Sequence, residues 1–142
     1  MSMYADLLTY LKSQSTVTTI VGAGTSARIY PDAIKQGATF PCLMYRKIGG
    51  GPMTGICGRL GISNDIFEVY AFGATRAAAD TLDEAVYAVL QGGNKTFGST
   101  AVTEVYVGES DRSSGADAPI EGSDQYDYWA RTVYTIWYAD GT

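Results

Sequence analysis

The clearest pattern of hydrophobic and polar positions is a strand that runs directly into a helix. Residues 64–72 (NDIFEVYAF) are rich in the aromatic and β-branched side chains typical of strands. Gly73-Ala74-Thr75 forms the corner, and residues 76–90 then repeat apolar side chains at helical spacing, namely Ala78, Leu82, Ala85, Val86 and Val89. The pattern predicts a buried strand followed by an amphipathic helix whose acidic residues, Asp80, Asp83 and Glu84, face water.

Similar patterns predict the remaining elements. A first helix is expected over residues 3–13, a second over 76–91, and strands near 42–48, 62–72, 101–108 and 126–138. The last strand carries large apolar side chains on both faces, so we expect it to be central and covered on both sides, or covered by a partner chain. These elements predict a single α+β domain over residues 1–142, with a mostly antiparallel sheet of about four strands, two main helices and a long hairpin loop.

A glycine-dense stretch and an acidic stretch separate these elements. Residues 49–61 contain six glycines together with three apolar residues, Met53, Ile56 and Leu60. This composition fits either a mobile surface loop or a segment that becomes ordered against a neighbouring subunit. Residues 109–127 contain six acidic residues and one basic residue, so their net charge equals the −5 of the whole chain. We expect this acidic stretch to be a solvated, mobile loop.

The composition excludes several kinds of chemistry. The chain has no histidine, which removes the commonest general base and metal ligand. Cys42 and Cys57 are too far apart in sequence for a close-spaced metal pair, and they are expected to be reduced apolar residues. Residues 20–27 imitate a dinucleotide-binding glycine motif, but Pro31 prevents the helix that this motif needs. We therefore expect no enzyme activity, no cofactor and no metal.

Targeting and nucleic-acid signals are also lacking. No apolar run approaches the ~20 residues needed to cross a membrane. The first residues lack the basic and apolar regions of a secretory signal. No basic stripe is present for gripping phosphates, so specific nucleic-acid binding is disfavoured.

Taken in order, several short motifs form a recognisable series. Leu7-Leu8-Thr9-Tyr10-Leu11 precedes Thr19-Ile20-Val21-Gly22, and Arg28-Ile29-Tyr30-Pro31 precedes Phe40-Pro41-Cys42-Leu43-Met44-Tyr45. The strand Phe67-Glu68-Val69-Tyr70-Ala71 then leads into the alanine-rich helix. In the order and spacing of these motifs, nearly the whole chain resembles the tail completion (tail terminator) proteins of long-tailed bacteriophages.

This resemblance implies a structural virion protein, made in the host cytoplasm and located at the head-proximal end of the tail. Such proteins form a ring, commonly a hexamer, that stops tail-tube polymerisation and offers a surface to the head-side connector or head-closure protein. DNA passes through the ring without sequence-specific binding. The expected subunit or partner interface consists of Met53, Ile56 and Leu60, with Arg59 available for an ion pair between subunits. The expected lining of the lumen is acidic and comprises Asp111, Asp117, Glu121 and Asp124.

Two other functions are compatible with the sequence. The nearest is another neck component, such as a head-closure or connector adaptor protein. The more remote alternative is a small-molecule-binding or enzymatic α+β domain that uses Asp and Tyr side chains, which would require a deep pocket with convergent carboxylates.

Overall fold

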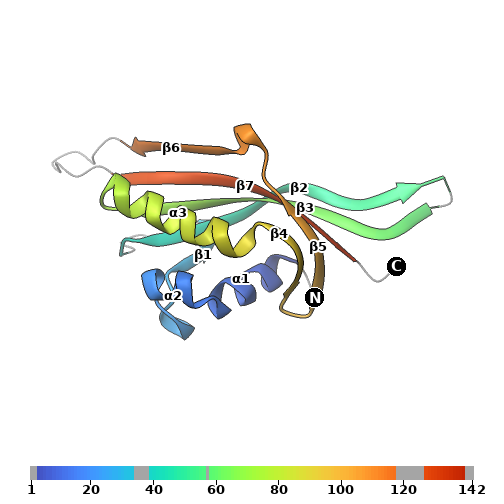
Figure 1. Ribbon diagram of the computed structural model, residues 1–142, viewed down its shortest axis with the longest axis horizontal. Helices are drawn as coiled ribbons and strands as arrows, with labels where there is room; N and C mark the ends of the chain where they lie inside the picture. The colour runs from blue at the N-terminus through green and yellow to red at the C-terminus, as the bar shows by residue number, and fades with distance from the viewer. Residues whose placement is uncertain (1–2, 34–38, 57, 118–126, 140–142) are drawn as a thin grey trace.

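The computed structural model describes residues 3–33, 39–56, 58–117 and 127–139 of the chain (Figure 1). The elements in chain order are α1 (Met3–Ser13), α2 (Ser15–Val21), η1 (Gly24–Ser26), β1 (Ile29–Pro31), β2 (Cys42–Gly55), β3 (Gly58–Gly73), α3 (Arg76–Leu90), β4 (Gly92–Phe97), β5 (Thr100–Tyr106), η2 (Glu109–Asp111), β6 (Arg112–Asp117) and β7 (Asp127–Ala139). The segments η1 and η2 are single 3-10 turns. Residues 15–21, for which no element is expected above, form the short helix α2.

One mixed sheet contains all seven strands of the described residues. Its order is β1-β2-β3-β7-β5-β4, and β6 also pairs with β7. The β1–β2 pair is parallel and the other pairs are antiparallel. Strands β5 and β6 occupy the same edge of β7, β5 along residues 135–138 and β6 along residues 127–132.

The predicted fold class was therefore wrong. Instead of about four antiparallel strands packed by two helices, the described residues form a seven-stranded mixed sheet with three α-helices. The missed strands are β1, β4 and β6, which are short and lack a run of alternating apolar residues. Their sequences are IYP, GGNKTF and RSSGAD. Backbone hydrogen bonds to a neighbouring strand stabilise these segments, and such bonds produce no periodic pattern of hydrophobic residues in the sequence.

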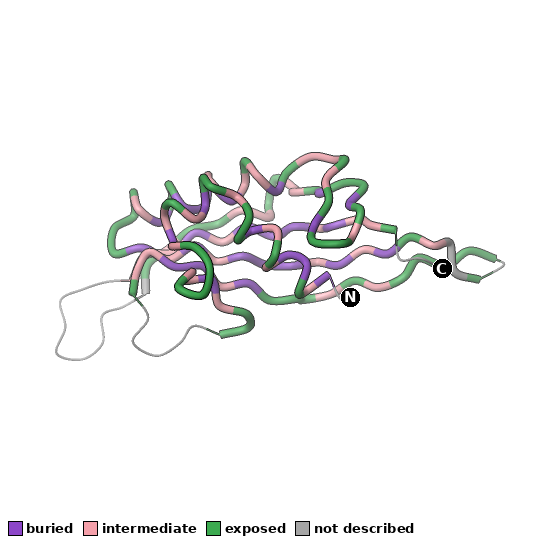
Figure 2. The backbone as a smooth tube through the Cα atoms, turned by 90° about the horizontal axis from the view of Figure 1, so that it is seen from below, coloured by how far each residue is buried: buried purple, intermediate pink, exposed green. Residues whose placement is uncertain are grey.

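A single hydrophobic core lies between the sheet and the helices. The strands contribute alternate side chains, including Leu43, Tyr45, Phe67, Val69, Tyr134 and Ile136, and the helices contribute Leu7, Leu11, Leu82, Val86 and Leu90, all 2% exposed or less. Side chains of the opposite parity in β2, β3 and β7 are absent from this core cluster. We call the two sides of the sheet the helix face and the open face. Figure 2 shows the alternation as buried segments interleaved with more exposed ones along the strands.

The strand-to-helix corner is formed as the sequence predicts, since α3 spans the expected residues 76–90. The Thr75 hydroxyl accepts a hydrogen bond from the backbone N–H of Ala78 at 3.1 Å and so caps the helix. At Gly73 the chain passes so close to α3 that an added Cβ would lie 2.7 Å from the backbone nitrogen of Ala79. A residue without a side chain is therefore required at this turn.

Loss of the cap should weaken the corner measurably. Thr75→Ala leaves the Ala78 N–H without its partner, so we expect the free energy of unfolding to fall by about 1 kcal/mol. Thr75→Asp retains an acceptor oxygen and should stay close to the wild-type value. Urea unfolding followed by circular dichroism measures both. Equal losses in the two variants would show that the hydroxyl does not act as a cap.

Most of the expected glycine-rich loop is paired strand. The β2–β3 ladder continues from Cys42↔Phe72 out to Gly55↔Gly58, with register shifts between Lys47 and Gly49 and between Pro52 and Thr54. Gly50 has a φ of +104° beside the Asn64 carbonyl, so this irregular position favours a glycine. The glycines thus allow the strands to bend and to pass closely, and the predicted hairpin exists with a much shorter tip.

The acidic stretch also differs from the expected loop. Its first part forms η2 and then β6, which pairs with β7 along residues 112–117. Residues 118–126 lie outside the described part of the chain.

Candidate assembly surfaces

The outer part of the β2–β3 hairpin projects from one end of the molecule (Figure 1). We call residues 49–61 the arm. Among the described residues the strands of the arm pair only with each other, because β7 reaches β3 no further than Ile62 and β1 covers β2 only at residues 43–45. Ile56 is 107% exposed and Met53 is 38% exposed. An isolated two-stranded ribbon is marginally stable in water, so an arm with an apolar tip is typical of a segment that binds another chain.

Half-exposed aromatic side chains gather on the open face of the sheet. Phe72 of β3 lies opposite Trp129 of β7, and Tyr70 lies in the next row. The centroid of the Tyr70 ring lies 5.7 Å from that of Phe72 and 5.8 Å from that of Trp129, and Phe40 stacks on Phe72 at 6.0 Å. We call these four residues the aromatic patch. Strand β7 is central, as predicted, but its open face is only partly shielded by the described residues.

A buried carboxylate lies next to the aromatic patch. Glu68 is 2% exposed, and its two carboxylate oxygens accept hydrogen bonds from Arg46 and Arg131, the latter at 2.7 Å. The bond to Glu68 raises the pKa of Arg131. Two guanidinium groups therefore share one buried carboxylate, and this arrangement holds Arg131 in place beside Tyr70.

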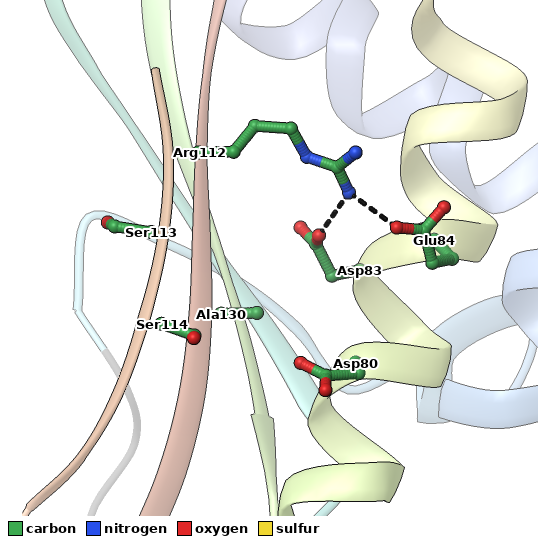
Figure 3. A pocket seen from close by; sticks show the side chains of 7 residues that line it. All are labelled: Asp80, Asp83, Glu84, Arg112, Ser113, Ser114 and Ala130. Atoms are coloured by element: carbon green, nitrogen blue, oxygen red, sulfur yellow. Dashed lines mark hydrogen bonds and ion pairs between the residues drawn. The ribbon is translucent and has the colours of Figure 1, made fainter. Parts of the chain in front are cut away.

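A cavity of about 340 Å³ lies between α3 and β6 (Figure 3). It is lined by Asp80, Asp83, Glu84, Arg112, Ser113, Ser114 and Ala130. Arg112 extends from β6 to α3 and donates to Asp83 at 2.6 Å and to Glu84 at 2.8 Å, and Thr132 donates to Asp83 at 2.8 Å. Burial acts to lower the pKa of Arg112, but the bonds to the two acids outweigh it and raise that pKa.

The cavity is best interpreted as a structural joint. Asp83 is only 8% exposed, so the prediction that it faces water was wrong. Its carboxylate instead forms an ion pair with Arg112, which connects α3 to the sheet. Two of the cavity's acids are paired with Arg112, which also lies 4.3 Å above the ring of Tyr87. In the part of the chain that the structure describes, no group of three His, Cys, Asp or Glu side chains is placed so that it could hold a metal ion.

The structure places the predicted interface residues together in the arm. Met53 lies on β2, Ile56 at the tip, and Arg59 and Leu60 on β3, although the side chains of the last two are outside the described set. Their role in assembly stays a prediction. The aromatic patch was not predicted as a single surface, because its members lie far apart in sequence and meet only through the β3–β7 register.

The four predicted lumen residues do not form one described cluster. The carboxylate of Asp111 accepts a hydrogen bond from the backbone N–H of Gly108 at 2.8 Å and closes the η2 turn. Asp117 ends β6, and Glu121 and Asp124 lie outside the described residues. None of the described helices is long and apolar enough to cross a membrane.

Two buried acids should make the fold sensitive to alkaline pH. Burial raises the pKa of the Cys42 thiol from 9.0 to about 11 and the pKa of Tyr45 from 10.0 to about 12. Below the ordinary pKa values of 9.0 and 10.0, which apply to the unfolded chain, both groups are protonated in the folded and unfolded states. In that range their burial contributes fully to the free energy of unfolding. Above those pKa values the unfolded chain loses its protons first, and the free energy of unfolding falls by about 1.4 kcal/mol per pH unit for each group.

This dependence can be measured by urea unfolding between pH 8 and pH 12, a range set by those two pKa values. Cys42→Ala should remove the decline that begins near pH 9. Tyr45→Phe should make the decline above pH 10 shallower without abolishing it, because burial also raises the pKa of Tyr4, Tyr10 and Tyr134. Each variant is compared with its own stability at pH 8, so the cost of the substitution itself cancels. Unchanged slopes in both variants would contradict the assignment.

Comparison with known proteins agrees with these observations. The fold resembles a chain from the virion of a native gene transfer agent (GTA) particle, with a TM-score of 0.60 and 13% sequence identity, covering 97% of this chain and 95% of that chain. No curated protein matches the chain by sequence. The model of the family described as tail completion protein gp17 matches residues 5–126, which include α3 and every strand except β7. The chain therefore belongs to the tail completion protein gp17 family and is a structural protein of the virion tail.

Proposed function

We propose that this protein completes the head-proximal end of a phage tail tube, as a ring of identical copies that is expected to be a hexamer. The ring stops tube polymerisation and provides the surface that joins the tail to the head-side connector or head-closure protein. The observation that carries this proposal is the family match over residues 5–126.

The surfaces of the chain support an assembly role. The arm has an exposed apolar tip, and the open face carries a half-exposed aromatic patch at a different place on the molecule. Aromatic side chains are enriched where proteins bind one another. Contacts between unlike surfaces of identical copies are head-to-tail, and they produce a ring when the rotation closes.

The acidic stretch supports a passage for DNA. Residues 109–127 carry the whole net charge of −5, and like charges repel the phosphate backbone. In this proposal Asp111, Asp117, Glu121 and Asp124 line the lumen, so DNA slides past without being held. A ring structure with these four residues on its outer rim would contradict this assignment.

A phage that lacks the gene tests the function. Electron microscopy of its lysate should show headless tails whose tubes vary in length, and a plasmid copy of the gene should restore uniform, joined tails. Tubes of normal length that fail to join heads would instead identify a connector adaptor. Purified protein added to polymerising tube subunits should bind tube ends and stop growth, and tubes that continue to grow would contradict the proposal.

Ring formation is tested separately, with light scattering on the purified protein and with negative-stain imaging of isolated tails. A closed ring at the head-proximal end is expected. A single copy at that position would contradict the ring.

A further inference from the structure

Strand β6 is an unprotected outer strand of the sheet. Its inner edge pairs with β7 along all six residues, and no described backbone group bonds to its outer edge. Natural proteins shield such edges with lysine, proline, irregular backbone or short strands. The other outer strands show these features: β1 has three residues and ends at Pro31, and β4 contains Lys95 beside Asn94, whose φ is +59°. The sequence of β6, RSSGAD, contains neither lysine nor proline, and its two charged residues stand at its two ends.

The side chains of β6 leave this edge open. Ser113, Ser114 and Ala116 are exposed but small, and Gly115 has no side chain. The one long described side chain, Arg112, is drawn back over the sheet by Asp83 and Glu84 and points to α3 (Figure 3). The ion pair therefore draws the longest described side chain of β6 away from the outer edge, and the guanidinium of Arg76 on α3 donates to the Ser114 hydroxyl at 2.5 Å.

The arm is a second part of the described chain whose strands have unpaired edges. Its two strands bond only to each other among the described residues, so each has an unused edge. The arm and β6 lie towards opposite ends of the long axis in Figure 1, so an arm reaches a β6 only on another copy. Residues 49–55 of the arm, seven in number, are long enough to span the six residues of β6.

We infer that the outer edge of β6 receives the arm of a second copy of this chain, which joins the two sheets through backbone hydrogen bonds. This inference rests on the proposed ring and identifies the contact that closes it. Backbone pairing supplies the affinity in this mode of recognition, and the small side chains of β6 allow close approach. Because the two surfaces differ, each copy offers an arm on one side and a β6 edge on the other, as a ring requires.

Disulfide cross-linking in isolated tails tests the contact. In a Cys57→Ser background, Met53→Cys on the arm is combined with Ser113→Cys on β6, and the tails are oxidised and run without reductant. A ladder of linked multimers is expected, because paired strands bring the two Cβ atoms within disulfide reach at one register or its neighbours. The matched control combines Met53→Cys with Thr81→Cys, which is exposed on α3. No ladder with Ser113→Cys, or an equal ladder in the control, overturns the inference.

A pair of proline variants adds a functional readout. Alternate residues of an antiparallel pair direct their N–H groups towards the partner strand, so only one of Ser113 and Ser114 directs its N–H outward. The outward variant should keep the wild-type melting temperature but lose complementation, because proline removes the donor. Full complementation by that variant overturns the inference. Rings that form without cross-links refute only the β6 contact, whereas tails without rings refute the proposed function.

Discussion

Replacing Met53 and Ile56 with aspartate is expected to abolish the production of infectious particles while the isolated chain folds normally. Both side chains are exposed in the single copy, so added carboxylates remain hydrated there. When the arm packs against another protein, the same carboxylates lose water without gaining a partner. An unpaired buried charge costs several kcal/mol, enough to prevent the contact. Plating efficiency of a complemented gene-deletion phage measures the loss.

The matched control places two aspartates at Thr81 and Ala88, which are exposed on α3. This variant carries the same added charge and should complement fully. Thermal unfolding of both purified proteins shows whether the fold survives. Normal plating by the arm variant would mean that the tip of the arm contacts nothing essential. A fall in its melting temperature alone would show that the arm belongs to the core of the single copy.

Removal of the Glu68 carboxylate should cause the second large effect. In the Glu68→Ala variant Arg46 and Arg131 lose their shared partner and repel one another across a partly buried site. Breaking such a pair costs about 3 kcal/mol, which corresponds to a fall of about 10 °C in melting temperature for a domain of this size. Calorimetry or urea unfolding at low salt measures the difference.

Three further variants identify the cause of this loss. Glu104→Ala removes an exposed acid from strand β5 of the same sheet and should be nearly neutral. Arg46→Ala should cost less than Glu68→Ala, because half of the Arg46 side chain is exposed and Arg131 still neutralises the carboxylate. The triple variant Arg46→Met, Glu68→Leu and Arg131→Met should regain most of the stability. If the triple variant is as unstable as Glu68→Ala, packing and not charge explains the effect.

The helices and the long strands were predictable because each produces a regular pattern in its own residues. The apolar positions of α3 recur at helical spacing, and the inner part of β3 and most of β7 are rich in aromatic and β-branched residues, so their bounds were nearly right. Strands β4 and β6 were missed because glycine, serine and asparagine suggest loops. These strands exist because their backbone groups bond to β5 and β7, and a sequence does not reveal a bond to a distant strand.

Of the candidate surfaces, some could be predicted from the sequence and others required the folded structure. Met53 and Ile56 could be found from sequence, because apolar residues within a glycine-rich stretch have no local structural purpose. The aromatic patch required the register that places Phe72 beside Trp129, and the position of β6 at an outer edge required the strand order.

By itself the sequence determined the kinds of residues and the local elements: an amphipathic helix after a buried strand, a glycine-rich hairpin, a chain without histidine and a concentration of acids near residue 115. The tertiary structure alone decided which strands are neighbours, which sheet face is open, and which carboxylates are buried, as for Glu68 and Asp83. The physical reason is range: helical and strand periodicities arise between residues a few positions apart. Strand order, burial and free edges depend on contacts between segments as distant as β3 and β7, which only the folded chain brings together.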